Sequence, residues 1–172
     1  MIQKTKGAER EYYLPFLATC IRKLTSRACE PAFLLHESQA DEAVVDRIQQ
    51  VAGGGLPVVR DSDPQVLKGI LGRAFLVIGS RYHALVAALS QGVPCVATGW
   101  SHKYQALLED YGCPDLLLPV STPEAQVCEV LERLTDDQAR AALTARLAQA
   151  AREQKQRTRE MWAEVDRVLG IV

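Results

Sequence analysis

Short, almost wholly apolar segments alternate with amphipathic helical segments along most of the chain. Apolar segments of a few residues are typical of strands that a parallel sheet buries on both faces, and helices cover such a sheet. The predicted strands span 31–37, 56–59, 75–78 and 94–97, with a short fifth strand at 116–118. The pattern therefore predicts an α/β fold with a doubly wound, mainly parallel, Rossmann-like sheet and right-handed crossovers.

Capping residues, prolines and glycines mark the ends of the predicted helices. Three glycines at 53–55 end one helix, and Asp63 caps another whose first residue is Pro64. Pro15 falls early in the first helix, where a first turn tolerates proline, and Thr122 is the capping residue of a later helix. The predicted helices span 9–27, 41–51, 84–90 and 102–111, and two more begin at 63 and 122.

The last part of the chain differs in composition from the rest. Residues 135–172 are rich in Ala, Arg and Gln and lack strand signals. A weak apolar stripe passes through Leu143, and a stronger stripe begins at Met161 and Trp162. We therefore predict a Rossmann-like domain with an N-terminal helix at 1–134. A C-terminal extension of one or two helices at 135–172 should pack on the same domain.

Composition excludes several classes of protein. The chain has 172 residues, 48% of them hydrophobic, so it can form a real core. Its net charge of −1 argues against a nucleic-acid partner bound mainly through phosphate charge. No run of 18 apolar residues exists, so we expect no membrane span. The N-terminal residues lack an apolar signal core, and we expect a cytoplasmic protein.

The cysteine pattern points to a reducing compartment. The five cysteines are odd in number and form no C-x-x-C pair, which argues against a disulfide framework and against a zinc site. No other cluster has metal-ligand spacing, so we expect no metal and no cofactor. Small buried thiols are the favoured interpretation. The alternative is a nucleophilic cysteine at Cys95 or Cys113.

Polar and basic residues concentrate where the predicted strands end. Ligands of open parallel α/β sheets bind outside the carboxyl ends of the strands. This rule selects four turns: His36 with Glu37, Arg60 with Asp61, residues 79–83, and residues 98–103. No Walker-type loop, G-x-G-x-x-G motif after the first strand or G-x-S-x-G elbow is present.

The turn Gly79-Ser80-Arg81-Tyr82-His83, hereafter the 79–83 turn, carries the most chemistry. Gly79 allows a close backbone approach, Ser80 can cap the next helix, and a helix start favours an anion. Arg81 adds a bidentate donor for carboxylate or phosphate, and His83, which should lie just inside the helix, can exchange protons. The alternative is that Ser80 only caps, Arg81 pairs with a surface acid and His83 is a satisfied buried histidine.

The turn Gly99-Trp100-Ser101-His102-Lys103, hereafter the 99–103 turn, has similar features. Ser101 can cap the helix that follows. Lys103 then falls in the first helical turn, where a positive charge opposes the helix dipole, so a lysine there makes more sense with an anion in front of it. The alternative is an exposed lysine lying over Trp100.

Residues 77–94, Val-Ile-Gly-Ser-Arg-Tyr-His-Ala-Leu-Val-Ala-Ala-Leu-Ser-Gln-Gly-Val-Pro, resemble the C-terminal domain of polysaccharide pyruvyl transferases. The following Trp-Ser-His-Lys-Tyr at 100–104, with Leu107 and Gly112, is similar to the next turn and helix of that family. The resemblance covers roughly 30–120 and is most specific at 77–112.

The resemblance implies a two-domain fold like that of the GT-B glycosyltransferases. Members transfer the enolpyruvyl unit of phosphoenolpyruvate to a sugar as a cyclic ketal. Carried over, it implies Arg81 and His83 as the catalytic pair. Gly79, Ser80, His102, Lys103 and, at a strand end, His36 would bind substrate.

The resemblance also implies a partner domain. A complete member has a further N-terminal α/β domain that contributes the acceptor side. We therefore expect half a site and little turnover from this chain alone.

Two other interpretations stay open. The domain could bind a nucleotide sugar, as the donor domains of GT-B glycosyltransferases do, with Asp115 as the nearest candidate for the ribose hydroxyls. It could also be a non-catalytic assembly module. Its exposed cleft, with Trp100 and Tyr104 at the surface, would then favour self-association.

Overall fold

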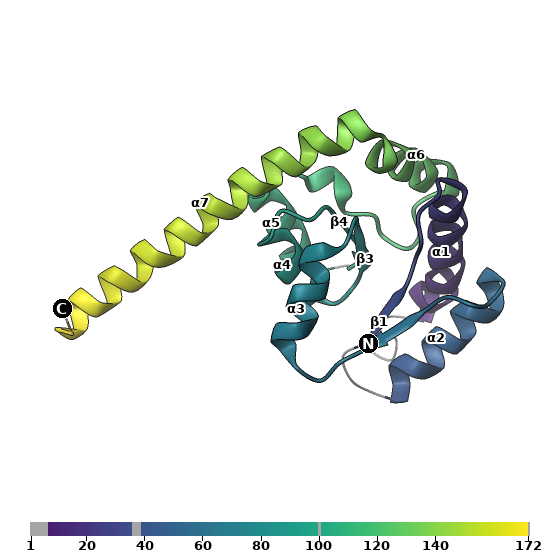
Figure 1. The fold of residues 1–172 in the computed structure, drawn as a ribbon, viewed down its shortest axis with the longest axis horizontal. Coiled ribbons are helices and arrows are strands. Elements are labelled where there is room, and N and C mark those ends of the chain that lie inside the picture. Colours follow the sequence, from purple (N-terminus) through teal and green to yellow (C-terminus); the bar gives the residue numbers. More distant parts are fainter. Residues whose placement is uncertain (1–6, 36–38, 100, 172) are drawn as a thin grey trace. The chain divides into compact units, whose positions relative to one another are not determined.

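The structure is a computed structural model that describes residues 7–35, 39–99 and 101–171. It is a mixed α/β fold whose elements follow one another as shown in Figure 1. They are α1 (Gly7–Ser26), β1 (Phe33–Leu35), α2 (Gln39–Ala52), β2 (Val58–Arg60), α3 (Pro64–Arg73), β3 (Val77–Gly79), α4 (Tyr82–Leu89), β4 (Cys95–Ala97), α5 (His102–Asp110), the 3₁₀ turn η2 (Pro114–Leu116), α6 (Glu124–Thr135) and α7 (Asp137–Leu169).

The described residues form two compact units. The first runs to Ile70 and also includes Leu118–Arg140, and the second consists of Leu71–Leu117 and the residues from Ala141 onward. Each unit holds one pair of parallel strands, β1 with β2 in the first and β3 with β4 in the second. The prediction of parallel strands between helices is confirmed, and the described strands lie in two two-stranded sheets. The doubly wound Rossmann-like sheet stays a prediction.

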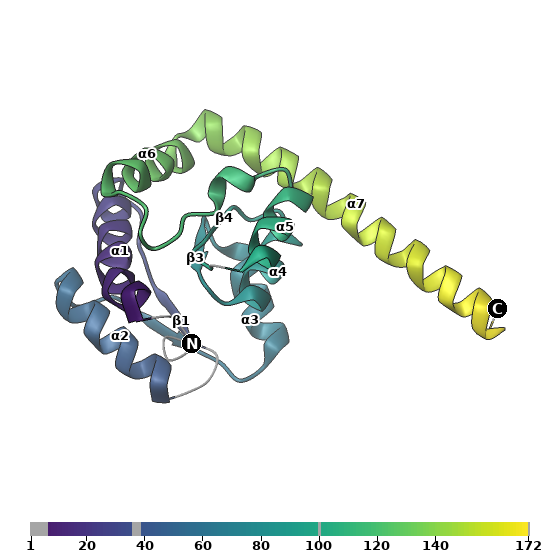
Figure 2. The ribbon, with the colours of Figure 1, turned by 180° about the vertical axis from the view of Figure 1, so that it is seen from behind.

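In the first unit, helices pack beside the β1–β2 pair. Phe33 pairs with Val58 and Leu35 with Arg60 in parallel register. Helix α1 contacts both α2 and α6, and these contacts bury Phe16, Cys20 and Leu131. Both ribbon views show α1 between its two neighbours (Figures 1 and 2). Residues far apart in the sequence thus share one core.

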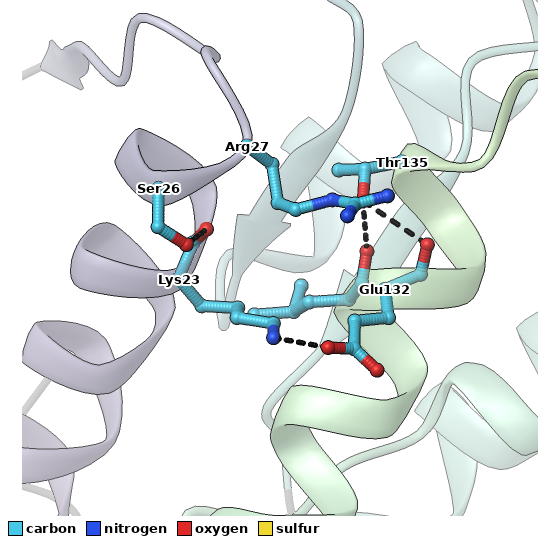
Figure 3. Close-up of polar contacts among 6 residues, drawn as sticks. Lys23, Ser26, Arg27, Glu132 and Thr135 are labelled. Carbon is cyan, nitrogen blue, oxygen red and sulfur yellow. Dashed lines mark hydrogen bonds and ion pairs between the residues drawn. The ribbon is translucent and has the colours of Figure 1, made fainter.

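A polar seam crosses the α1–α6 contact (Figure 3). The Lys23 ammonium pairs with the Glu132 carboxylate, and this pairing lowers the pKa of Glu132. The Arg27 Nε donates to Thr135 Oγ1 at 3.2 Å, and Thr135 Oγ1 donates to the Leu131 carbonyl oxygen at 2.8 Å. The two cations therefore face the C-terminal turn of α6, the end of a helix that favours positive charge.

In the second unit, β3 and β4 form the centre. Val77 pairs with Cys95 and Gly79 with Ala97, so both strands end at the same edge. Leu85, Leu108 and Leu147 contribute fully buried side chains from α4, α5 and α7. Burial of each such side chain stabilises the fold by about 1.5–3 kcal/mol relative to leaving it exposed.

The prediction of a fifth strand at 116–118 is wrong. Pro114–Leu116 forms a 3₁₀ turn in which the Leu116 amide donates to the Cys113 carbonyl. Only an isolated parallel bridge between Ala97 and Leu117 continues the sheet there. The physical reason is Pro114, whose fixed φ and missing amide hydrogen favour a turn.

Two predicted helix starts also need correction. Helix α1 begins at Gly7, so Pro15 lies inside the helix and not in its first turn. Helix α6 begins at Glu124 after an N-cap at Pro123 that makes no side-chain capping bond. The Thr122 hydroxyl donates instead to the Pro119 carbonyl oxygen at 2.6 Å. By contrast, Asp63 accepts from the Gln65 amide at 2.7 Å ahead of Pro64, as predicted.

The tail forms one helix, α7. No glycine or proline interrupts it, and pairs such as Gln149 with Glu153 at 2.7 Å support its exposed faces. The sequence predicts that the stripe beginning at Met161 and Trp162 packs back on the domain. Both side chains are more than half exposed instead, at 52% and 57%. The weaker stripe around Leu143 is the part of α7 that is buried.

Candidate functional site

The 79–83 turn joins β3 to α4. Gly79 is the last residue of β3, and Arg81 holds the N-cap position with φ −85° and ψ 109°. Its carbonyl oxygen accepts from the Ala84 and Leu85 amides at 3.0 and 3.2 Å. The prediction that Ser80 caps the helix is therefore wrong, because the helix starts one residue later than such a cap requires.

The side chains of Arg81 and His83 are exposed. His83 is the second residue of α4, so its predicted place just inside the helix is confirmed. The interpretation of His83 as a satisfied buried histidine is wrong. The imidazole is accessible to a ligand and to solvent.

The 99–103 turn joins β4 to α5 and behaves as predicted at its cap. The Ser101 hydroxyl oxygen accepts from the Lys103 amide at 3.4 Å, and His102 is the first residue of α5. The side chains of His102 and Lys103 are exposed. Neither α4 nor α5 has an acidic residue in its first turn. Two helix starts with partial positive charge thus present cationic side chains without carboxylates in those turns.

The two turns lie against each other. The Thr98 amide donates to the Gly79 carbonyl oxygen at 3.0 Å, which extends the β3–β4 pairing beyond the strands. The Tyr104 hydroxyl donates to the Ser80 carbonyl oxygen at 2.7 Å. The structure therefore brings together the two turns that the sequence separates by about twenty residues.

The Tyr104 ring also limits the size of the side chain that the 99–103 turn can hold at position 99. A Cβ atom on Gly99 would lie 2.2 Å from Cε2 of the Tyr104 ring, so no larger residue fits there without a shift. Tyr104 is only 6% exposed. The expectation of a surface Tyr104 in a self-association cleft is therefore wrong, since the ring packs inward on Gly99.

Lys103 lies over two aromatic rings. Its Nζ is 4.9 Å from the centroid of the Tyr82 ring and 5.3 Å from that of the Tyr104 ring. The Tyr82 and Tyr104 rings meet edge to face at 5.7 Å. The sequence did not reveal either partner, because an aromatic residue near a helix start gives no signal of a cation above its ring.

A buried hydroxyl lies at the same edge of the sheet. Thr98 follows β4 directly and is 6% exposed, and its Oγ1 has no hydrogen-bond partner among the described residues. Buried hydroxyls are normally hydrogen-bonded, so this unpaired oxygen next to the 99–103 turn could accept a hydrogen bond from a ligand or a water molecule.

The sequence also singled out His36, Trp100 and Arg60. His36 and Trp100 lie outside the described residues, so their roles stay predictions. Arg60 is the last residue of β2 in the first unit, where it pairs with Glu42 at 3.4 Å.

The cysteine alternative is not supported by the burial of the thiols. Cys95 and Cys113 are fully buried, and burial raises the pKa of both thiols, that of Cys113 to about 12. Such thiols are poor nucleophiles at neutral pH. Among the residues that the structure describes, no group of three or more His, Cys, Asp or Glu side chains could hold a metal ion.

What the two turns can do chemically follows from their groups. Backbone amides at two helix starts, a guanidinium and an ammonium favour a ligand with more than one anionic group. An exposed imidazole beside them can carry a proton. The site therefore suits a small phosphorylated or carboxylated molecule.

Comparisons with known proteins identify the family of this chain. The chain matches the family described as polysaccharide pyruvyl transferase over residues 6–102, which include the whole 79–83 turn and end at His102. No curated protein and no solved structure matches the chain significantly. No helix within the described residues combines the length and the apolar character needed to cross a membrane. Because the matched residues make up more than half of the sequence, the chain belongs to the polysaccharide pyruvyl transferase family.

Proposed function

We propose that this chain carries the donor side of a pyruvyl transferase and binds phosphoenolpyruvate at the 79–83 and 99–103 turns. The observation that carries the proposal is the contact between the two turns through the Tyr104–Ser80 hydrogen bond. This bond joins the turn that carries Arg81 and His83 to the start of α5, which carries Lys103. Phosphoenolpyruvate has a carboxylate and a phosphate, and the site has two cationic side chains and two helix starts.

The proposed roles follow from the chemistry of ketal formation. A proton adds to the methylene carbon of phosphoenolpyruvate, two sugar hydroxyls bond to the neighbouring carbon, and the bond from that carbon to the phosphate oxygen breaks. The hydroxyls lose two protons in total: one balances the new methyl group, and the other leaves with inorganic phosphate. His83 would supply or accept the proton that moves.

The cationic residues would hold the two anionic groups of the donor. Arg81 matches a carboxylate or phosphate with two parallel donors, and Lys103 offsets charge that builds on the leaving phosphate. Gly79, Ser80 and His102 would contact the donor through backbone and side-chain atoms. This scheme places the whole donor on the second unit.

The acceptor belongs to another part of the enzyme in this proposal. The family implies a saccharide acceptor. We propose that a second α/β domain contributes the acceptor side. The 172-residue chain would then bind the donor but show little turnover.

Calorimetric titration of the 172-residue chain tests the proposal. Phosphoenolpyruvate should bind, and Arg81→Ala should weaken binding at least ten-fold, because a bidentate charged contact contributes about 1.5–3 kcal/mol. Arg73→Ala is the matched control, since Arg73 is an exposed arginine in the last turn of α3. Preferential binding of uridine or cytidine nucleotides would favour a nucleotide-sugar domain instead.

A further inference from the structure

The ammonium group of Lys103 is placed by aromatic rings and not by an acid. Within the described part of the chain, no carboxylate forms an ion pair with Lys103, whereas its Nζ lies over the Tyr82 and Tyr104 rings. We call these three side chains the aromatic seat. All three belong to the second unit.

The rings stabilise a positive charge that the start of α5 disfavours. A lysine in the first turn of α5 opposes the partial positive charge of the helix start. The negative face of an aromatic ring attracts the ammonium and offsets that cost. A carboxylate partner would do the same but would compete with an incoming anion. A ring face leaves the positive charge available to one.

The seat is itself held in place. The Tyr82 ring meets the Tyr104 ring edge to face, with an interplanar angle of 78°. The Tyr104 ring is fixed at one side by the backbone of Gly99 and at its hydroxyl by the Ser80 carbonyl oxygen. Tyr82 also lies between Arg81 and His83 in the chain, so the seat ties the lysine to the turn that carries those side chains.

We infer that Tyr82 and Tyr104 are positioning residues that hold the Lys103 ammonium over the joined turns, ready for an anionic group of the ligand. The inference rests on the proposed function only in naming phosphoenolpyruvate as the natural ligand. The binding of an anion at the aromatic seat depends only on its three side chains. The inference predicts affinity for inorganic phosphate as well.

Two substitutions at Tyr82 separate this role from general packing. Tyr82→Phe keeps the ring face and Tyr82→Leu removes it, while both keep an apolar side chain at a half-buried position. In the 172-residue chain, the ε-methylene protons of Lys103 should be shifted upfield by the rings. NMR should show this shift in the wild type and largely retained in Tyr82→Phe, but much reduced in Tyr82→Leu.

Binding is measured on the same three proteins with inorganic phosphate and with phosphoenolpyruvate. Tyr82→Leu should weaken phosphate binding about two- to five-fold, the change that an exposed cation–π contact supports, and Tyr82→Phe should bind like the wild type. In the background Lys103→Met, Tyr82→Leu should have no further effect. That loss of effect shows that the ring acts through the lysine.

The outcomes distinguish the inference from the proposed function. An unshifted Lys103 ε-methylene signal in the wild type, no phosphate binding, or equal affinity of Tyr82→Leu and wild type overturns the inference. A shifted signal and ring-dependent phosphate binding support it, even if phosphoenolpyruvate fails to bind. In that case the proposed function is wrong, and the inference about the aromatic seat is supported.

Discussion

The Tyr104 hydroxyl donates a hydrogen bond of 2.7 Å to the backbone carbonyl oxygen of Ser80. The bond links the first turn of α5 to the turn between β3 and α4, across 24 positions of sequence. It holds the turn that carries Arg81 and His83 against the start of the helix that carries Lys103. Its removal should therefore affect both stability and the geometry of the site.

Tyr104→Phe should lower the free energy of unfolding by about 1 kcal/mol, because the ring stays and one hydrogen bond is lost. Urea unfolding followed by circular dichroism measures the change. Tyr12→Phe is the control, since Tyr12 is 51% exposed and should leave stability unchanged. Equal stabilities of Tyr104→Phe and wild type would contradict the structural role given to this bond.

Gly99→Ala should be destabilising by about 1–3 kcal/mol, since the new methyl group overlaps the Tyr104 ring and forces it to move. Gly69→Ala is the matched control. Gly69 lies within α3, and a methyl group added there would meet no neighbouring side chain within 4 Å, so alanine should be neutral or slightly stabilising. Chemical unfolding of the two variants side by side makes the comparison, and similar midpoints would argue against a close approach at Gly99.

Thiol reactivity should divide the cysteines into two groups. Cys20, Cys95 and Cys113 are buried, and burial raises the pKa of each thiol, so they should react with a thiol reagent at pH 8 only after unfolding. Cys29 and Cys128 are half-buried and should react first in the folded protein. Absorbance of the released chromophore counts the reacting thiols with and without denaturant. Rapid reaction of all the thiols in the folded state would contradict their burial.

Stability should fall at alkaline pH because of the same thiols. The pKa of Cys20 is raised from its ordinary value of 9.0 to about 12 in the folded protein, with burial as the main cause. Below pH 9 the thiol is protonated in both states. Above pH 9 only the unfolded state loses the proton, so folding loses about 1.4 kcal/mol per pH unit for each such thiol until pH approaches 12.

The variant Cys20→Ala isolates this effect. Its free energy of unfolding should be lower than that of the wild type at pH 7.5, because a buried side chain is shortened. The difference between the two proteins should narrow as the pH rises from 9 to 10.5. A constant difference over that range would show that Cys20 does not carry the alkaline loss.

The sequence predicted the local structure around the two turns better than it predicted the sheet. The strand ends at Gly79 and Ala97, the cap at Ser101 and the place of His83 in α4 depend on local signals, namely apolar runs, glycine and capping residues. Such signals act over a few residues and can be recognised without the fold. The prediction of a cap at Ser80 was wrong by one residue, since the N-cap is Arg81. Capping patterns in a sequence do not fix the start of a helix to a single residue.

Contacts between distant residues could not be predicted in the same way. The seating of Lys103 on Tyr82 and the approach of Tyr104 to Gly99 depend on how two turns meet after β3 and β4 pair. An apolar stripe likewise gives no information about whether a partner surface exists. For this reason the stripe predicts a buried Trp162, whereas its side chain is 57% exposed.

NMR mapping of backbone amide shifts tests whether the two joined turns bind phosphoenolpyruvate. Titration of the 172-residue chain with phosphoenolpyruvate should shift the amides of Ser80, Arg81 and Lys103 together with their neighbours in the two turns. The backbone amides of α7 beyond Met161 serve as the internal control, and their signals should not shift. Shifts that leave both turns untouched, or no saturable shifts at all, would contradict the claim.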